Sequence, residues 1–240
     1  SGLVGSEMCI RDRITDSQTT ASLARDFGFS GSNLFVFPWG VDLKQFAFSP
    51  QPETTELRFV SVRSHEPVYD IPTIIEGFAR ISQGSARERF GLTVVGRGST
   101  TEECLRTAEK HEIRSLIEWH GPYPESQMPG LISQHHGTVS AAYSDGSSIS
   151  MLQTMACGRL AIVTDIPSNL EWIEDGVNGF VFELGSAESL AETFKRINAV
   201  RSDLRAIGIN ARRTAEKRAD WGNNQQLLKS AYERLLRDFA

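Results

Sequence analysis

The segment 141–165 carries the residues best suited to hold a charged ligand. It reads AAYSDGSSISMLQTMACGRLAIVTD, which predicts a strand, a loop of small residues, a helix from about Ser147 to Cys157 and a second strand. A strand that enters a helix through Asp-Gly-Ser-Ser exposes backbone N–H groups at the helix start, where the helix dipole adds partial positive charge. The segment therefore predicts a site for phosphate.

The residues of this loop suit such a site. Gly146 lets a ligand approach the backbone because it has no Cβ, and Ser147 and Ser148 can cap the helix or bind phosphate oxygens. Asp145 and Gln153 lie eight positions apart, so both can face one ligand that lies across the helix start. A purely structural alternative, in which Asp145 and the serines only cap a helix, stays open on this segment alone.

The elements that must position this loop begin at residue 57, from where short β-rich runs alternate with longer amphipathic stretches. This alternation is typical of an α/β fold, a parallel sheet with helices on both faces. Apolar residues at Ile71, Ile74, Ile75 and Phe78 have helical spacing. The predicted strands are 57–62, 92–96, 115–121, 137–143, 160–165 and the FVFEL run after the turn 175–180. The predicted helices are 71–81, 101–111, 125–134, 147–157 and 169–173. After the FVFEL run the chain is predicted to be helical to its end, with a last helix over 223–239.

Composition and charge exclude several classes of protein. The hydrophobic share of 40% and charged share of 23% fit a globular domain, and the net charge of −5 argues against a nucleic-acid binder. The three cysteines, Cys9, Cys104 and Cys157, are too few for a disulfide framework or a zinc cluster, which predicts a cytoplasmic protein. Cys157 is expected in the core. The adjacent His135 and His136 diverge on a helix, so we interpret them as structural.

The two ends of the chain need separate interpretation. Residues 3–12, LVGSEMCIRD, resemble the in-frame translation of a sequencing adapter, so we exclude residues 1–13 from functional reasoning. Residues 14–50 are less regular and predict a remnant of an N-terminal domain with an interdomain hinge. We expect residues 51–218 to form the ligand-binding domain and residues 219–240 a helix that packs back toward an N-terminal domain, most of which is missing.

Five stretches in the right order resemble the retaining GT-B glycosyltransferases of family four, the glycosyl transferases group 1. They cover most of residues 30–185 and are similar to the family's Pro-Asn-Gly-Val-Asp hinge, its Gly-x-Gly turn, its Glu-Gly-Phe-Gly and Leu-Glu-Ala-Met-Ala-Cys-Gly signature, and its Asp-Gly-x-Asn-Gly stretch. The matching segments here are FPWGVDLKQF (37–46), VVGRGS (94–99), DGSS (145–148), LQTMACG (152–158) and WIEDGVNGFVFE (172–183). The resemblance implies the Rossmann-like C-terminal domain of a GT-B enzyme, which binds a nucleoside-diphosphate sugar.

Carried over by position, the resemblance implies roles for six residues of the signature. Asp145 would be the catalytic-site residue that contacts donor-sugar hydroxyls, and the backbone of Gly146, Ser147 and Ser148, continued by Ile149, would hold sugar and phosphate. At residue 153, a glutamine stands where the family has a glutamate that binds the ribose. A neutral amide makes weaker hydrogen bonds than a carboxylate, so this change and the shortened acid at position 145 imply weakened, retuned or lost activity.

A further departure concerns the charge that meets the diphosphate. Arg63 matches an arginine of the family and can bind phosphate through its fork of donors, but Val68 and Tyr69 occupy the region where a lysine is expected. His65 either supplies partial charge there or is structural. The resemblance implies no metal and no cofactor beyond the donor, because Arg63 and the helix start take the role of Mg²⁺.

The nucleobase is expected in loops at the carboxyl ends of the strands. These are the Gly-x-Gly turn, with Gly96, Arg97 and Gly98, and the segment 121–123. Arg97 can equally be a solvated turn residue. Tyr123 can stack on a base or cover the sheet edge.

The function implied by the resemblance is transfer of a sugar from a UDP-, GDP- or ADP-sugar to a saccharide or lipid-linked acceptor, as in polysaccharide biosynthesis, with retention of configuration. Because the acceptor domain completes such a site, we expect the fragment to bind donor weakly and to be inactive alone. Peripheral membrane association would come through the missing domain. The alternatives are a GT-B nucleotide-sugar epimerase or phosphorylase-like enzyme and a degenerate, non-catalytic binding module. An NAD-binding domain fits less well because VGRGSTTEE lacks the third glycine of its fingerprint.

Overall fold

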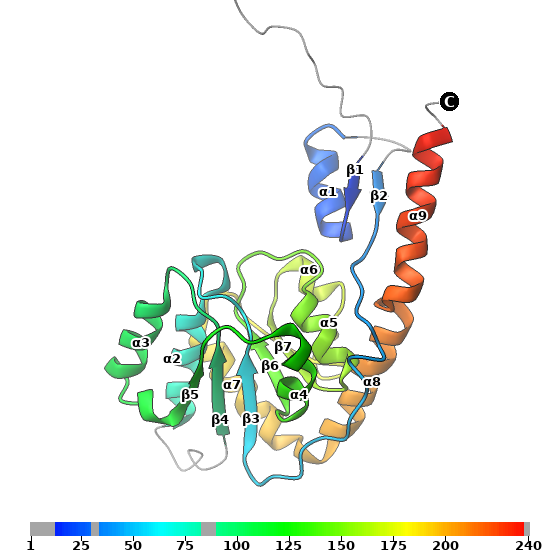
Figure 1. Ribbon diagram of the computed structural model, residues 1–240. Helices are drawn as coiled ribbons and strands as arrows, with labels where there is room; N and C mark the ends of the chain where they lie inside the picture. Colours follow the sequence, from blue (N-terminus) through cyan, green and yellow to red (C-terminus); the bar gives the residue numbers. More distant parts are fainter. Residues whose placement is uncertain (1–12, 30–33, 83–89, 238–240) are drawn as a thin grey trace, which may run out of the picture.

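The computed structural model describes residues 13–29, 34–82 and 90–237 (Figure 1). The adapter-like residues 3–12 lie outside the described residues. No helix within the described ranges is long and apolar enough to cross a membrane.

A six-stranded parallel sheet forms the centre of the molecule, in the order β5-β4-β3-β6-β7-β8. The chain therefore builds outward from β3 in one direction and then returns to build outward from β6 in the other. The point between β3 and β6 is the topological switch point of the sheet, where doubly wound folds bind ligands beyond the carboxyl ends of the strands. The strands are β3 (Leu57–Ser61), β4 (Phe90–Val95), β5 (Ile117–His120), β6 (Gly137–Ser140), β7 (Leu160–Thr164) and β8 (Phe180–Phe182).

Helices cover both faces of this sheet (Figure 1). On one face Ile74, Phe78 and Phe194 pack on strand residues such as Phe59. On the other face, residues of α5 and α8 join the turn after α6 in a second core. The helices are α2 (Ile71–Ser82), α3 (Thr101–Lys110), α4 (Met128–Ser133), α5 (Ile149–Ala156), α6 (Pro167–Leu170), α7 (Ala187–Ala199), α8 (Leu204–Arg218) and α9 (Trp221–Arg237). The predicted fold class is confirmed.

Two predicted helices begin later than the sequence pattern indicates. The predicted helix 125–134 starts with a 3-10 turn, η4 (Glu125–Gln127), and becomes α-helical at Met128, one residue before Pro129. The predicted helix 147–157 begins at Ile149, because Ser148 still has an extended backbone with φ −60° and ψ 109°. The loop before α5 is thereby longer than expected, and it is this loop that carries the candidate site.

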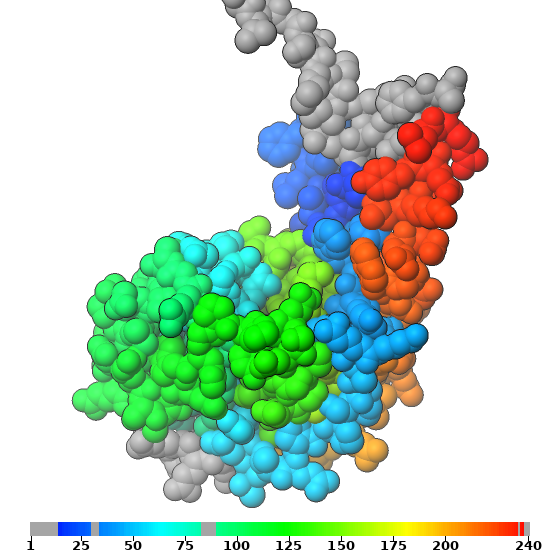
Figure 2. Space-filling view, viewed as in Figure 1, coloured from blue at the N-terminus to red at the C-terminus, as the bar shows by residue number. Residues whose placement is uncertain are grey.

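The segment 14–50 contains more regular structure than its sequence indicates. Two short parallel strands, β1 (Arg13–Thr15) and β2 (Leu34–Val36), flank α1 (Gln18–Asp26). Strands of three residues are too short to show an alternating pattern. In the space-filling view this β1–α1–β2 unit and the end of α9 form a projection above the larger body of the molecule (Figure 2).

Two segments of the chain, 38–41 and 218–224, are hydrogen-bonded to each other between this projection and the body. The Val41 N–H donates to the Ala219 carbonyl at 2.8 Å, and the Trp221 N–H donates to the Val41 carbonyl at 3.1 Å. The Asn224 side-chain amide donates to three carbonyl oxygens, those of Pro38, Trp39 and Arg218. The segment after β2 and the start of α9 are therefore held side by side.

The buried His136 makes the fold sensitive to acid. Burial, with smaller contributions from nearby arginines, lowers its pKa to about 4, and its Nδ1 accepts a hydrogen bond from the Arg58 N–H at 3.1 Å. In the unfolded chain a histidine has a pKa of about 6.5, so the unfolded state takes up the proton first. The stability that the neutral ring confers is thus present above pH 6.5 and is lost as the pH falls toward 4.

We expect His136→Asn to reduce this acid sensitivity, because an asparagine oxygen can accept the same hydrogen bond without titrating. Between pH 7.5 and 5.0 the unfolding free energy of the wild type should fall by about 2 kcal/mol more than that of the variant. Urea unfolding at the two pH values measures this difference. Equal losses in the two proteins would show that His136 does not carry the effect.

Candidate functional site

An arginine and an aspartate meet at the switch point of the sheet. Arg63 follows the carboxyl end of β3 and Asp145 follows β6, the neighbouring strand. The Arg63 Nη2 lies 2.8 Å from the Asp145 Oδ2, and the two side chains are only 11% and 18% exposed. Such a half-buried, charge-assisted hydrogen bond is stronger than an ion pair on the surface. The pair therefore places one positive and one negative charge where this fold binds ligands.

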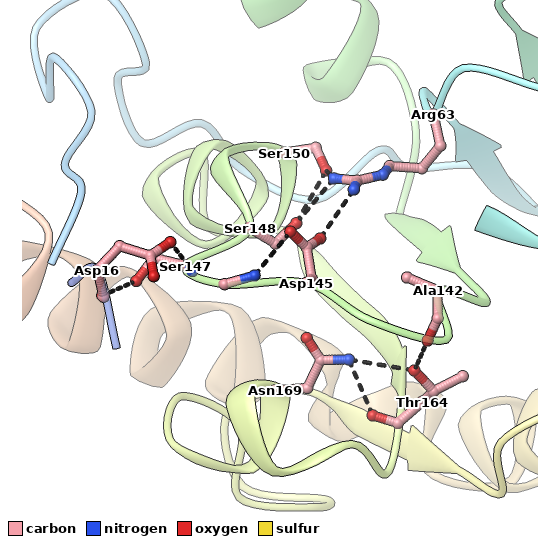
Figure 3. Close-up of polar contacts among 10 residues, drawn as sticks. Asp16, Arg63, Ala142, Asp145, Ser147, Ser148, Ser150, Thr164 and Asn169 are labelled. Atoms are coloured by element: carbon pink, nitrogen blue, oxygen red, sulfur yellow. Dashed lines mark hydrogen bonds and ion pairs between the residues drawn. The ribbon is translucent and has the colours of Figure 1, made fainter. Parts of the chain in front are cut away.

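The Arg63 guanidinium is held on its other sides as well (Figure 3). Its Nη1 donates to the Ser148 Oγ at 3.0 Å and to the Ser150 Oγ at 3.1 Å. The ring of Tyr69 lies against the guanidinium, with the Cζ 3.9 Å from the ring centroid. Ser150 is not predictable as a site residue from the sequence, because a serine inside the first turn of a helix gives no signal of its own.

The start of α5 lies beside this pair. In the described part of the chain, Ser148 stands at the N-cap position but makes no capping hydrogen bond with its side chain. The Leu152 N–H donates to the Ser148 carbonyl, and the N–H groups before it cannot be bonded within the helix. Helix capping, which the structural alternative expected of the serines, is not what their side chains do, because Ser148 binds Arg63 and Ser147 binds another partner.

That partner is Asp16, at the end of β1. The Asp16 Oδ2 accepts from the Ser147 N–H at 2.9 Å, and the Ser147 Oγ donates to the Asp16 carbonyl at 2.6 Å (Figure 3). A Cβ at Gly146 would overlap the Asp16 carboxylate, so only glycine leaves room for this contact. The backbone expected to hold sugar and phosphate thus binds a carboxylate of the β1–α1–β2 unit.

A second polar network fixes the chain between β6 and the loop. The Thr164 Oγ1 donates to the Ala142 carbonyl at 2.7 Å, and the Asn169 amide donates to the Thr164 carbonyl at 2.9 Å. All three residues are buried. The strand end that leads to Asp145 is therefore held by the end of β7 and by α6 (Figure 3).

The Gly-x-Gly turn after β4 packs against the loop that carries Arg63. The His65 N–H donates to the Arg97 carbonyl at 3.1 Å, and a Cβ at Gly98 would overlap the His65 carbonyl. The Arg97 side chain is exposed and Gly96 has φ +132°. His65 is buried, its Nδ1 lies 3.1 Å from the Thr101 Oγ1, and burial lowers its pKa. Of its two alternatives, the structure favours the structural one.

The remaining predicted residues lie around the same edge. Gln153 is buried in the second turn of α5, and Ile149 in the first turn is partly exposed. The half-buried Tyr123 packs on a small apolar cluster that includes Val60 and Leu131. This packing leaves both of the predicted roles of Tyr123, stacking on a base and covering the sheet edge, as predictions. His135, His136 and Cys157 are buried, in agreement with a structural role. The two histidines do not lie on a helix as expected, because α4 ends at Ser133 and both residues are in the bend that follows it.

Comparison with known proteins gives a family match over most of the body. The family model described as glycosyl transferases group 1 matches residues 44–214. This range begins in the segment before β3, ends within α8 and contains every predicted site residue.

Individual relatives are distant in sequence. An uncharacterized glycosyltransferase of Methanocaldococcus jannaschii is 22% identical over 69% of this chain and 42% of its own length. The MMP alpha-(1->4)-mannosyltransferase of Mycolicibacterium hassiacum is 21% identical over 95% of this chain and 55% of its own length. The chain therefore spans about half the length of these curated relatives.

Among solved structures, HepE of Anabaena in complex with UDP superposes with a TM-score of 0.81. The two sequences are 17% identical, and the match covers 92% of this chain and 63% of HepE. The structure of HepE in complex with UDP-glucose superposes on this chain with a TM-score of 0.80. At this identity the likeness shows the fold.

Proposed function

The chain belongs to the glycosyl transferases group 1, and on that premise we propose that it is the donor-binding half of a retaining GT-B glycosyltransferase. In this proposal residues 51–218 bind a nucleoside-diphosphate sugar, and a separate acceptor-binding domain completes the active site. The β1–α1–β2 unit and residues 219–240 belong to the junction between the two domains. The half-length match to the curated relatives supports this division.

The observation that carries the proposal is the meeting of Arg63, Asp145 and the start of α5 at the switch point. A diphosphate placed there would face the guanidinium and the N–H groups at the start of α5, which attract anions. The carboxylate of Asp145 can accept hydrogen bonds from sugar hydroxyls. We propose that the guanidinium and the helix start stabilise the leaving diphosphate without a metal ion.

We propose a UDP-sugar as the donor, with a saccharide or a lipid-linked saccharide as acceptor. HepE, which has the same fold, was crystallised with UDP and with UDP-glucose. In this proposal residues 51–218 bind the donor, and transfer also needs the acceptor-binding domain. Gln153 is the residue we assign to the ribose, where it can both donate and accept hydrogen bonds.

Titration with UDP, GDP and ADP tests the proposal. A ligand that binds only the folded state raises its stability in proportion to the logarithm of ligand concentration over Kd. We expect the thermal unfolding midpoint to rise with UDP at millimolar concentration, and to rise less with the other two nucleotides. No shift with any of the three would contradict donor binding, and a larger shift with GDP or ADP would replace UDP in the proposal.

The charge of Asp145 gives a further prediction for the bare nucleotide. The Asp145 carboxylate is paired with the Arg63 guanidinium, and its negative charge repels a diphosphate that approaches this guanidinium. Asp145→Asn should therefore bind UDP about fivefold more tightly, since an amide keeps the shape and removes the repulsion. Isothermal titration measures both proteins.

The matched control for this variant is Glu118→Gln. Glu118 pairs with Arg58, an arginine at the other end of β3, at 2.9 Å. The control removes the same charge from an arginine pair far from the switch point, so UDP affinity should not change. Weaker binding in Asp145→Asn would show that the carboxylate orients Arg63 more than it opposes the ligand.

A further inference from the structure

Tyr69 stands in the region where the family resemblance places a lysine, and its ring contacts Arg63, the arginine that pairs with Asp145. The loop from residue 64 to residue 70 reads SHEPVYD and has no lysine or arginine in its sequence. In the structure the Arg63 Cζ lies 3.9 Å from the centroid of the Tyr69 ring. A guanidinium at this distance from an aromatic face is attracted by the ring electrons.

We infer that Tyr69 is a positioning residue for the diphosphate, which it serves by fixing the plane of the Arg63 guanidinium. This inference rests on the proposed function. Arginine is a long side chain with much rotamer freedom, and it binds two phosphate oxygens well only in one orientation. Here the ring holds the face of the guanidinium, while Ser148 and Ser150 accept hydrogen bonds from its Nη1.

The turn that carries Tyr69 is itself tied down on two sides. It is a 3-10 turn, η1 (Pro67–Tyr69), in which the Tyr69 N–H donates to the Glu66 carbonyl at 2.9 Å. On one side the Tyr143 N–H donates to the Val68 carbonyl at 2.8 Å. The turn is therefore joined to the segment between β6 and Asp145.

On the other side the turn is joined to the start of α2. Asp70 has a left-handed backbone, with φ 42°, and its carboxylate accepts from the Thr73 Oγ1 at 2.6 Å. The Tyr69 ring packs partly on the main apolar core. These contacts hold the turn on both sides and therefore fix the position of the Tyr69 ring.

The site would therefore bind the diphosphate differently from a site that has the lysine. A lysine would add a second, mobile charge, whereas Tyr69 adds no charge and makes the single guanidinium better oriented. The aromatic face is the part that matters in this role, and the hydroxyl is dispensable. Tyr69→Phe should therefore behave like the wild type, and Tyr69→Leu should not.

The experiment compares UDP binding by isothermal titration in the wild type, Tyr69→Phe and Tyr69→Leu. We expect the UDP Kd to stay within about twofold in the phenylalanine variant and to rise about five- to tenfold in the leucine variant. Tyr232→Leu, which removes an exposed tyrosine of α9, is the matched control and should bind as the wild type. If Tyr69→Leu does not fold, Tyr69→Met supplies the same comparison.

A second readout reports on Arg63 without any ligand. The side-chain N–H signal of Arg63 in NMR spectra should be shifted by the ring in the wild type and in Tyr69→Phe, and should lose that shift in the leucine variant. Unchanged UDP binding in Tyr69→Leu, equal weakening in Tyr69→Phe, or an Arg63 signal that does not respond to the ring would each overturn the inference. Absence of UDP binding in the wild type would instead overturn the proposed function, while the NMR signal would still test the contact.

Discussion

Arg63→Ala is expected to weaken UDP binding by about 10- to 100-fold. Hydrogen bonds to a charged group contribute roughly 1.5–3 kcal/mol each, and about 1.4 kcal/mol corresponds to a tenfold change in Kd. The truncated side chain also leaves Asp145 unpaired at the switch point, where its charge then repels the diphosphate. Isothermal titration or the shift of the unfolding midpoint with UDP measures the effect.

Two further variants separate the charge from the geometry. Arg63→Lys keeps the charge but loses the fork of donors, so its Kd should lie between those of the wild type and the alanine variant. Arg58→Ala removes an arginine from the other end of the same strand, where it pairs with Glu118, and should leave the Kd unchanged. Wild-type affinity in Arg63→Ala would exclude this arginine from the site.

Arg159→Leu is expected to lower the unfolding free energy by about 4 kcal/mol. Arg159 is only 1% exposed, and its guanidinium donates to the Ser49 carbonyl, the Ser49 Oγ, the Pro50 carbonyl and the Ser133 carbonyl. These acceptors lie on partly buried or exposed residues and would lose a charged donor, and a hydrogen bond to a charged group contributes roughly 1.5–3 kcal/mol. The variant should also loosen the segment that leads into β3, since two of its residues lose their partner.

Urea unfolding measures this effect, with Arg205→Leu as the control. Arg205 is exposed on α8, so its replacement should change the unfolding free energy by less than about 0.5 kcal/mol. Arg159→Lys should be intermediate, because a lysine cannot reach acceptors on two segments at once. An unchanged midpoint in Arg159→Leu would show that other contacts hold the segment before β3.

Periodicity made the body of the fold predictable. The apolar spacing of Ile71, Ile74 and Phe78 gives α2, and the short β-rich runs give the strands, because both patterns arise from burial against the neighbouring layer. The approximate place of the site was predictable too. Arg63 and Asp145 each follow a strand, and in a parallel sheet the strand ends lie along one edge.

The contacts within the site were less predictable, because they join residues far apart in the sequence. Nothing in the sequence near Asp16 indicates that its carboxylate binds Ser147, 131 positions later. The stacking of Tyr69 on Arg63 depends on how the turn after β3 folds back. The serines gave a misleading signal, since Ser148 has the residue type of a helix cap but binds the arginine.

The double connection near Asn224 limits how the β1–α1–β2 unit can move. Residues 38–41 and 218–224 are bonded to each other, so the unit cannot turn about one connection while the other stays still. The rings of Trp39 and Trp221 are stacked across the same place. The orientation of Asp16 over the loop before α5 therefore depends on the connection of α8 to α9 as well as on the segment after β2, and any bending at this place must move both segments together.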